Sequence, residues 1–302
     1  MKIKKHQIII LHAILLLGLA LLVVKYVEEI KALKENVYYA VEAAQNPETV
    51  VEPDSLRPVK TNGDEWFIDH PLIYHAGGAV DGGSYTNAVE AVENTLREGN
   101  RFIELDFRYT SDHQLVCNHD WKDAFLEDKE LTLEEFAASK IQGKFTPLTA
   151  EHLIEIMREH TDMYLVTDVK DEGCIDSVIT DLVLLAGEDA SVLDRFIIQL
   201  YTGREKSSIQ EIYPFKDEQF LFTIYNWGRW SLEVPQICNE ENISVITVPY
   251  GEIPDEDVSL VRELGFTVYE HTVNRADEAR KSLKRGISGF YTDFLSQEDL
   301  EP

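Results

Sequence analysis

Carboxylates, histidines and a lysine stand at the ends of short apolar runs in this chain. In RFIELDF, Glu104 and Asp106 are two residues apart, so on a β-strand their side chains point to the same side. Ile103, Leu105 and Phe107 take the alternate positions and form an apolar side, which argues against a pair of solvated surface acids. Two carboxylates confined together repel each other unless a cation lies between them. The pattern therefore predicts a binding site for a hard divalent metal ion.

A second acidic strand end follows at Asp168, in the run MYLVTDV, with Lys170 two residues later. By the same alternation both side chains face inward, so Asp168 would be a third oxygen ligand and Lys170 a positive donor for an anionic group. The alternative is an internal Asp–Lys ion pair that only ends the strand. His75 ends the run LIYH and His119 follows QLVCN, which places two imidazoles at strand ends.

Two imidazoles beside a metal ion suit the cleavage of a phosphodiester. One neutral imidazole removes a proton from the attacking hydroxyl, and one imidazolium protonates the leaving oxygen. The metal ion and the lysine hold the non-bridging oxygens and stabilise charge as it develops. A lone histidine near a turn is more often structural, so the case for His75 and His119 depends on their lying with the three acids.

Strand and helix signals alternate over residues 66–302, and the elements they predict must position the candidate residues. Strands separated by helices imply right-handed crossovers and a parallel sheet, and eight such units in about 240 residues match an α/β fold, the (β/α)8 TIM barrel. An open doubly wound sheet fits the alternation too, but the sequence lacks the Gly-rich phosphate turn typical of that fold. The long connection at 108–162 predicts an insertion. The eight predicted strands are LIYHA, RFIELDF, MYLVTDV, RFIIQLY, QFLFTIY, ISVITVPY, FTVYEHTV and ISGFYTD.

The carboxyl ends of barrel strands carry the chemistry, and the seventh run brings one more candidate. Glu270 and His271 end this run, and only one of them can face the pocket. His271 shares a side with Tyr269, which favours His271 as a substrate-binding residue. Asp293 closes the last run and is expected to cap the following turn.

The composition limits the classes of partner. The chain has 302 residues, with 28 Lys and Arg against 55 Asp and Glu, and a formal net charge of -27. Such a surface repels phosphates at long range, so no nucleic-acid partner is expected. Cys117, Cys174 and Cys238 have no short spacing and suit neither a disulfide framework nor a zinc motif. A share of 44% hydrophobic and 27% charged residues is typical of a globular domain.

The N-terminal residues predict a membrane anchor. Residues 8–24 are apolar except for His12, and Lys2, Lys4 and Lys5 precede them. The run is near the shortest that crosses a bilayer, and no small-residue cleavage site follows it. Lysines before the run favour a cytoplasmic N-terminus, so the domain would face outward from the cell membrane on a single-pass anchor. A cleaved signal peptide is the alternative.

Four segments follow from these patterns. Residues 1–26 form the transmembrane anchor. Residues 27–45 repeat apolar positions at intervals of three and four and form a helical stalk, through which two copies could pair as a weak dimer. Residues 46–65, rich in Pro, Asp, Glu and Asn, form a linker, and residues 66–302 form the barrel domain.

The order and spacing of the motifs resemble those of the glycerophosphodiester phosphodiesterase family, over about residues 70–295. The chain departs from the family pattern at Ala76, where the family has Arg, and at Asp168, where it usually has Glu. A third departure is His271, where the family usually has a Trp that lines the glycerol pocket. Arg108 could partly replace the missing guanidinium. The matching motifs are HAG at 75–77, TNAVEA at 86–91, ELD at 104–106, NHD at 118–120, TDVK at 167–170, VYEHTVN and GISGFYTDFL.

The resemblance implies a metal-dependent phosphodiesterase that cleaves glycerophosphodiesters to glycerol phosphate and an alcohol. The two strand-end histidines would be the acid–base pair, and Lys170 would contact the phosphate. Glu104, Asp106 and Asp168 would hold a calcium or magnesium ion. A hydroxyl of the substrate's own glycerol would attack first, and water would open the resulting cyclic phosphate. Deacylated phospholipids and glycerol-phosphate polymers are the expected substrates.

Two other functions stay open at this point. A phospholipase related in fold, such as a phosphoinositide-cleaving or sphingomyelinase-D-like lyase, would stop at the cyclic product. A catalytically inactive barrel could serve as a membrane-tethered binding module, although such a barrel has no physical need for uncompensated acids at its mouth.

Overall fold

The computed structural model of the chain describes residues 51–61, 63, 65–125, 129–227 and 229–301. The predicted anchor and helical stalk lie outside the described residues, as do the first five residues of the predicted linker. Within the described part of the chain, no helix combines the length and the apolar character that crossing a bilayer requires.

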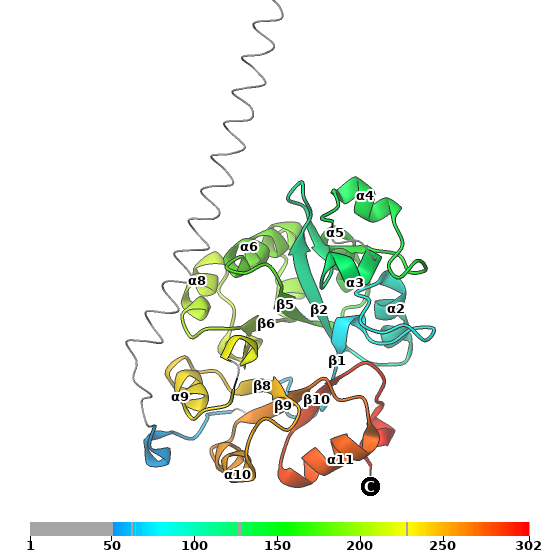
Figure 1. Cartoon of the computed structure of the whole chain (residues 1–302). Coiled ribbons are helices and arrows are strands. Elements are labelled where there is room, and N and C mark those ends of the chain that lie inside the picture. The colour runs from blue at the N-terminus through cyan, green and yellow to red at the C-terminus, as the bar shows by residue number, and fades with distance from the viewer. Residues whose placement is uncertain (1–50, 62, 64, 126–128, 228, 302) are drawn as a thin grey trace, which may run out of the picture. The chain divides into compact units, whose positions relative to one another are not determined.

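Eight parallel strands close into a barrel, as the alternation of strand and helix signals predicts. Neighbouring strands follow the chain order, and the first strand pairs with both the second and the last, which leaves no open edge in the barrel. Figure 1 shows the first strand beside the last one. The strands are β1 (Leu72–Tyr74), β2 (Phe102–Tyr109), β5 (Tyr164–Val169), β6 (Phe196–Leu200), β7 (Phe220–Thr223), β8 (Val245–Pro249), β9 (Thr267–His271) and β10 (Gly289–Thr292).

The inside of the barrel has an apolar layer toward the start of the strands. Each strand contributes a side chain to this layer, and the Trp66 ring, which precedes β1, stacks on Phe102 at 5.5 Å and on Tyr269 at 6.0 Å. The residues further along each strand on the same side are therefore the ones that reach the mouth. The layer consists of Phe67, Ile73, Phe102, Val166, Ile197, Leu221, Val245, Tyr269 and Tyr291.

Helices surround the barrel and cover the outward side chains of its strands (Figure 1). The connection between the fourth and fifth barrel strands holds a helix at Glu205–Ile212. The helices are α2 (Val89–Arg97), α3 (Trp121–Phe125), α4 (Leu133–Ala138), α5 (Ala150–Glu159), α6 (Ile175–Ala186), α7 (Ala190–Leu193), α8 (Glu205–Ile212), α9 (Glu233–Glu240), α10 (Asp255–Glu263) and α11 (Ala276–Arg285).

The predicted insertion between the second and third barrel strands is present and contributes to the mouth. It contains β3 (Leu115–Cys117) and β4 (Leu148–Thr149), which are antiparallel, together with α3 and α4. Because β3 pairs with the far end of β2, the chain returns over the barrel mouth, where the Asn118 N–H donates to the Asp106 carbonyl at 2.9 Å. This return carries His119 toward the acids on β2.

Residues before β1 contact the outside of the barrel. The Arg57 N–H donates to Asn239 Oδ1 at 2.8 Å, and the Val59 N–H donates to the Leu264 carbonyl at 2.7 Å. The described part of the predicted linker is thus fastened to α9 and to the residues that follow α10.

Candidate active site

Three carboxylates meet at the mouth of the barrel. Glu104 and Asp106 come from β2 and Asp168 comes from β5, where Asp106 and Asp168 are directly paired in register. One oxygen of each carboxylate lies within 4.8 Å of the others, and all three side chains are buried. Among the described residues, Glu104 Oε1 has no hydrogen-bond partner despite its burial, and Asp106 Oδ1 has only the Lys170 ammonium, at 2.9 Å, against it. Three buried carboxylates at this spacing, one with an oxygen that has no partner, fit a hard divalent cation such as Ca2+ or Mg2+.

The remaining oxygens of β2's two acids are fixed by the segment between β1 and β2. The Ala76 N–H donates to Glu104 Oε2 at 2.8 Å. Asn87 donates from Nδ2 to Asp106 Oδ2 at 2.6 Å and accepts from the Asp106 N–H at 2.9 Å. Asn87 belongs to the TNAVEA motif, so this motif acts by orienting an acid rather than by reacting.

Asp168 and Lys170 lie together, as their spacing predicts. Lys170 Nζ is 2.8 Å from Asp168 Oδ2 and 2.9 Å from Asp106 Oδ1. The other oxygen of Asp168 accepts a hydrogen bond from the Tyr201 hydroxyl. Tyr225 places its ring 5.6 Å from the Lys170 ammonium, at a position compatible with a cation–π contact. The ion pair that the sequence left as an alternative therefore exists, and it lies within the acidic site itself.

The acids do not share one charge state. Burial and the charge of Asp106 raise the pKa of Glu104 to about 8, against the opposing effect of His75. Burial opposes ionisation of Asp106 as well, but Lys170, His75 and His119 outweigh it and hold the pKa of Asp106 below its ordinary value. Burial likewise opposes the charge on Lys170, yet the neighbouring acids raise the pKa of this ammonium. The site thus holds a lysinium next to an ionised Asp106.

His75 follows β1 directly and is buried. Its Nδ1 lies 2.9 Å from Asp293 Oδ1, so Nδ1 donates to this carboxylate and Nε2 remains for a substrate. Burial opposes protonation of His75, but the hydrogen bond to Asp293 and the charges of Glu104 and Asp106 outweigh it and raise the pKa of His75 to about 9.

Asp293 was expected only to cap a turn, yet it orients His75. Asn274 donates from Nδ2 to Asp293 Oδ2 at 2.7 Å and accepts from the Asp293 N–H at 2.8 Å, which fixes the carboxylate in place. The sequence held one signal for this contact. The first and last strands of a closed barrel are neighbours, here with Tyr74 opposite Thr292, so the residues that follow them meet.

His119 is partly exposed, and its ring contacts the Tyr85 ring, as that of His75 does. The ring centroids of His75 and His119 are each 4.7 Å from that of Tyr85. His119 Nδ1 is 3.0 Å from Asp120 Oδ2, which orients the imidazole in the same manner as Asp293 orients His75. The two predicted acid–base histidines therefore lie near each other, and both contact an aromatic ring that the sequence did not single out.

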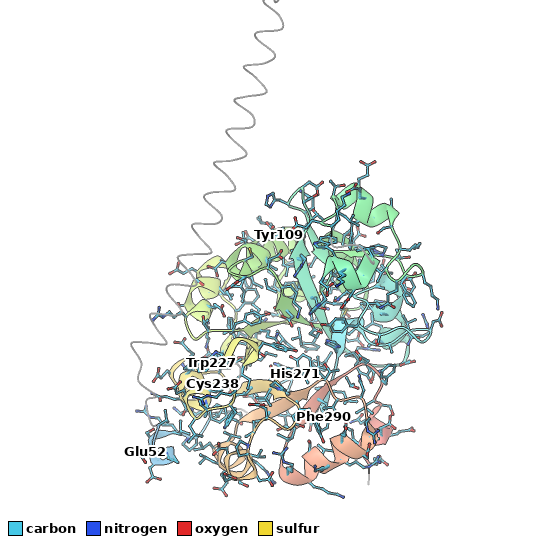
Figure 2. The ribbon with its side chains drawn as sticks, in the orientation of Figure 1. Glu52, Tyr109, Trp227, Cys238, His271 and Phe290 are labelled. Carbon is cyan, nitrogen blue, oxygen red and sulfur yellow. The ribbon has the colours of Figure 1, made fainter. Side chains whose placement is uncertain are left out.

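His271, labelled in Figure 2, ends β9 on the same side as Tyr269, inside the barrel, whereas Glu270 faces outward to Arg285. The His271 ring lies 4.2 Å from that of Tyr225 and 6.2 Å from that of Tyr291. Burial, together with the positive charges of His75 and Lys170, lowers the pKa of His271 to about 3. His271 is therefore a neutral imidazole, and its buried Nε2 has no hydrogen-bond partner among the described residues.

One departure from the family pattern is Ala76, for which Arg108 was the suggested replacement. Ala76 is fully buried with φ 48°, in the left-handed region, and contributes only backbone groups. Arg108 is two residues beyond Asp106 on β2 and forms an ion pair with Asp171 at 3.4 Å. The guanidinium suggested as a replacement thus already has a carboxylate partner.

The chain was compared with known families and structures. The model of the glycerophosphoryl diester phosphodiesterase family matches residues 81–297. The comparison with curated proteins finds no match.

Solved structures share the fold at low identity. A putative glycerophosphodiester phosphodiesterase from Galdieria sulphuraria has a TM-score of 0.64 at 16% identity, over 74% of this chain and 94% of that one. A putative glycerophosphoryl diester phosphodiesterase from Silicibacter pomeroyi has a TM-score of 0.60 at 18% identity, over 76% and 93%. A phosphodiesterase from Oleispira antarctica, in complex with the product sn-glycerol-3-phosphate, has a TM-score of 0.62 at 16% identity, over 74% and 92%.

The family match covers most of the barrel, from the segment after β1 to the residues after β10. It includes the ELD and NHD motifs on which the resemblance was drawn, whereas the HAG motif at 75–77 lies before the matched residues. The chain therefore belongs to the glycerophosphoryl diester phosphodiesterase family and is an enzyme of the phosphoric diester hydrolase class.

Proposed function

We propose that this chain hydrolyses glycerophosphodiesters to glycerol phosphate and an alcohol, with the help of a calcium or magnesium ion. The observation that carries the proposal is the convergence of three buried carboxylates within 4.8 Å, with Glu104 Oε1 left without a hydrogen-bond partner among the described residues. The family supports the reaction class, and the product complex of the Oleispira antarctica enzyme supports a glycerol-phosphate product.

Glu104, Asp106 and Asp168 would hold the ion, which would polarise a non-bridging phosphate oxygen and offset the charge that develops there. Lys170 would donate to a second non-bridging oxygen, because it carries the ammonium nearest to the acids. His271, a neutral imidazole with a buried, unsatisfied Nε2, would bind a hydroxyl of the substrate.

His75 and His119 would form the acid–base pair. Each has Nδ1 beside a carboxylate, Asp293 or Asp120, which leaves Nε2 of each ring for the substrate. One imidazole would accept the proton of a substrate hydroxyl as it attacks phosphorus, and the other would protonate the departing oxygen. The two imidazoles would then exchange these roles when water opens the cyclic phosphate.

Chelation gives the direct test of the metal. The full chain should release choline and glycerol phosphate from glycerophosphocholine, and EDTA should lower the rate about a hundredfold or more, with recovery on addition of Ca2+ or Mg2+. The products are followed by phosphorus NMR, which also detects a cyclic phosphate.

Other outcomes of this experiment would replace the proposal. Turnover that is insensitive to EDTA would remove the metal. Accumulation of the cyclic phosphate without opening would indicate the lyase. Binding without turnover of any glycerophosphodiester, unchanged in His75→Ala, would indicate a binding module.

We also propose that residues 1–26 anchor the chain in the cell membrane with the barrel outside the cytoplasm, and that residues 27–45 form a stalk able to pair with a second copy. The apolar run at 8–24 behind three lysines supports this location, where glycerol-phosphate polymers and deacylated lipids are available as substrates. The full chain should stay with membranes after alkaline carbonate extraction, and protease added to intact cells should cleave the barrel. Release by carbonate would contradict the anchor, and protection from protease would contradict the orientation.

A further inference from the structure

Lys170 pairs with two of the three acids that would hold a divalent ion. Its ammonium lies 2.9 Å from Asp106 Oδ1 and 2.8 Å from Asp168 Oδ2, and these two acids belong to the group of three carboxylates. The other oxygen of Asp106 accepts from Asn87, and the other oxygen of Asp168 accepts from Tyr201. Every oxygen of these two aspartates therefore has a donor or a cation against it.

We propose that Lys170 is an internal cation that competes with the metal, so that metal binding requires its ammonium to leave both aspartates. The inference rests on the proposed function, because it concerns the same metal site. While the ammonium contacts Asp106 Oδ1 and Asp168 Oδ2, these two oxygens are not free to bind a divalent ion, and the affinity for the ion is lower. The ammonium and a metal ion bound to the same two carboxylates would also repel each other.

The structure provides a route for the displaced ammonium. Lysine carries its charge on a flexible four-carbon stem, and 18% of the Lys170 side chain is exposed, in contrast to 0% for Asp106. The Tyr225 ring lies 5.6 Å from the ammonium, and 43% of Tyr225 is exposed. Movement toward Tyr225 would keep a cation–π contact and bring the ammonium toward solvent, where a phosphate oxygen can accept from it.

The competition has a thermodynamic consequence. A phosphate group that binds the displaced ammonium stabilises the arrangement in which the aspartates are free, and so raises the affinity for the metal. By linkage the metal raises the affinity for phosphate by the same factor. Lys170 would thus lower metal affinity in the substrate-free enzyme and couple metal binding to the arrival of a phosphodiester.

Calorimetric titration of the full chain with MgCl2 or CaCl2, without substrate or phosphate, tests the competition. Lys170→Met should bind the ion about tenfold tighter than the wild type or more, which corresponds to about 1.4 kcal/mol. The matched control is Arg108→Met. It also removes one positive charge, but Arg108 pairs with Asp171 and not with the three carboxylates of the site. This control should change the affinity by less than about threefold.

The possible results separate the two proposals. Equal affinities of Lys170→Met and wild type, or an equal gain in Arg108→Met, would overturn the competition while the metal site stands. Absence of binding to both wild type and Lys170→Met would overturn the metal site itself.

Loss of Lys170 leaves two buried aspartates without a cation, so the fold of the variant is checked by circular dichroism. A crystal structure of the wild type soaked in CaCl2 decides the matter if the variant does not fold. The ammonium should lie beyond hydrogen-bond distance of both aspartates, and retention of both contacts beside a bound ion would overturn the proposal.

Discussion

Glu104→Gln should lower turnover of a glycerophosphodiester about a thousandfold, even with excess metal ion. The amide keeps an acceptor for the Ala76 N–H, but it removes the charge of the one carboxylate whose second oxygen has no partner among the described residues. Kinetics measure kcat of the variant, and calorimetry measures its affinity for the metal ion. Wild-type turnover in a folded Glu104→Gln chain would contradict the role of Glu104.

The same substitution should leave the fold intact in metal-free buffer. Because the pKa of Glu104 is raised to about 8 from an ordinary value of 4.5, the folded chain binds a proton that the unfolded chain releases between these pH values. The free energy of unfolding of the wild type therefore falls as pH rises across this window. Glutamine has no such proton, so Glu104→Gln should be at least as stable as the wild type at pH 8 in urea denaturation. A strongly destabilised variant would indicate a structural role instead.

The sequence was sufficient for the strands and for the side of each strand that carries the acids. A β-strand alternates its side chains with a period of two, so the apolar residues at 103, 105 and 107 settle the direction of Glu104 and Asp106. The parallel pairing of β2 with β5 then brings Asp168 opposite Asp106. Both steps depend on local pattern and on one rule of topology, which explains their success.

The contacts that the sequence did not reveal join residues far apart in the chain. The Tyr201 hydroxyl reaches Asp168, and the Tyr85 ring contacts both His75 and His119. Their residue types are as common in cores as in sites, so no spacing distinguishes them. Asp293 was assigned to a turn because its partner, His75, is 218 positions away. The roles of the site residues, and the anchor and stalk at residues 1–45, stay predictions.

The second large effect is expected for substitution of His75. His75→Gln should lower kcat about a hundredfold to ten-thousandfold, because it removes one of the two proton-transfer groups. Asp293 acts through His75, so Asp293→Asn should lower kcat less and should move the His75 limb of the pH–rate profile to lower pH. The direction follows from the hydrogen bond and charge by which Asp293 raises the pKa of His75.

A double-mutant cycle separates positioning from simple support of the fold. If Asp293 matters only through the His75 imidazole, Asp293→Asn should have almost no further effect on kcat in a His75→Gln background. Additive losses in the double variant, together with an unmoved pH profile in Asp293→Asn, would mean that Asp293 holds the end of β10 instead. Asn274→Ala offers a graded check, because Asn274 fixes the Asp293 carboxylate without contacting His75 in the hydrogen bonds of the described residues. Its kcat should lie between those of the wild type and Asp293→Asn. The Asp293 carboxylate remains charged in this variant but is less well oriented, so it still stabilises the protonated imidazole in part.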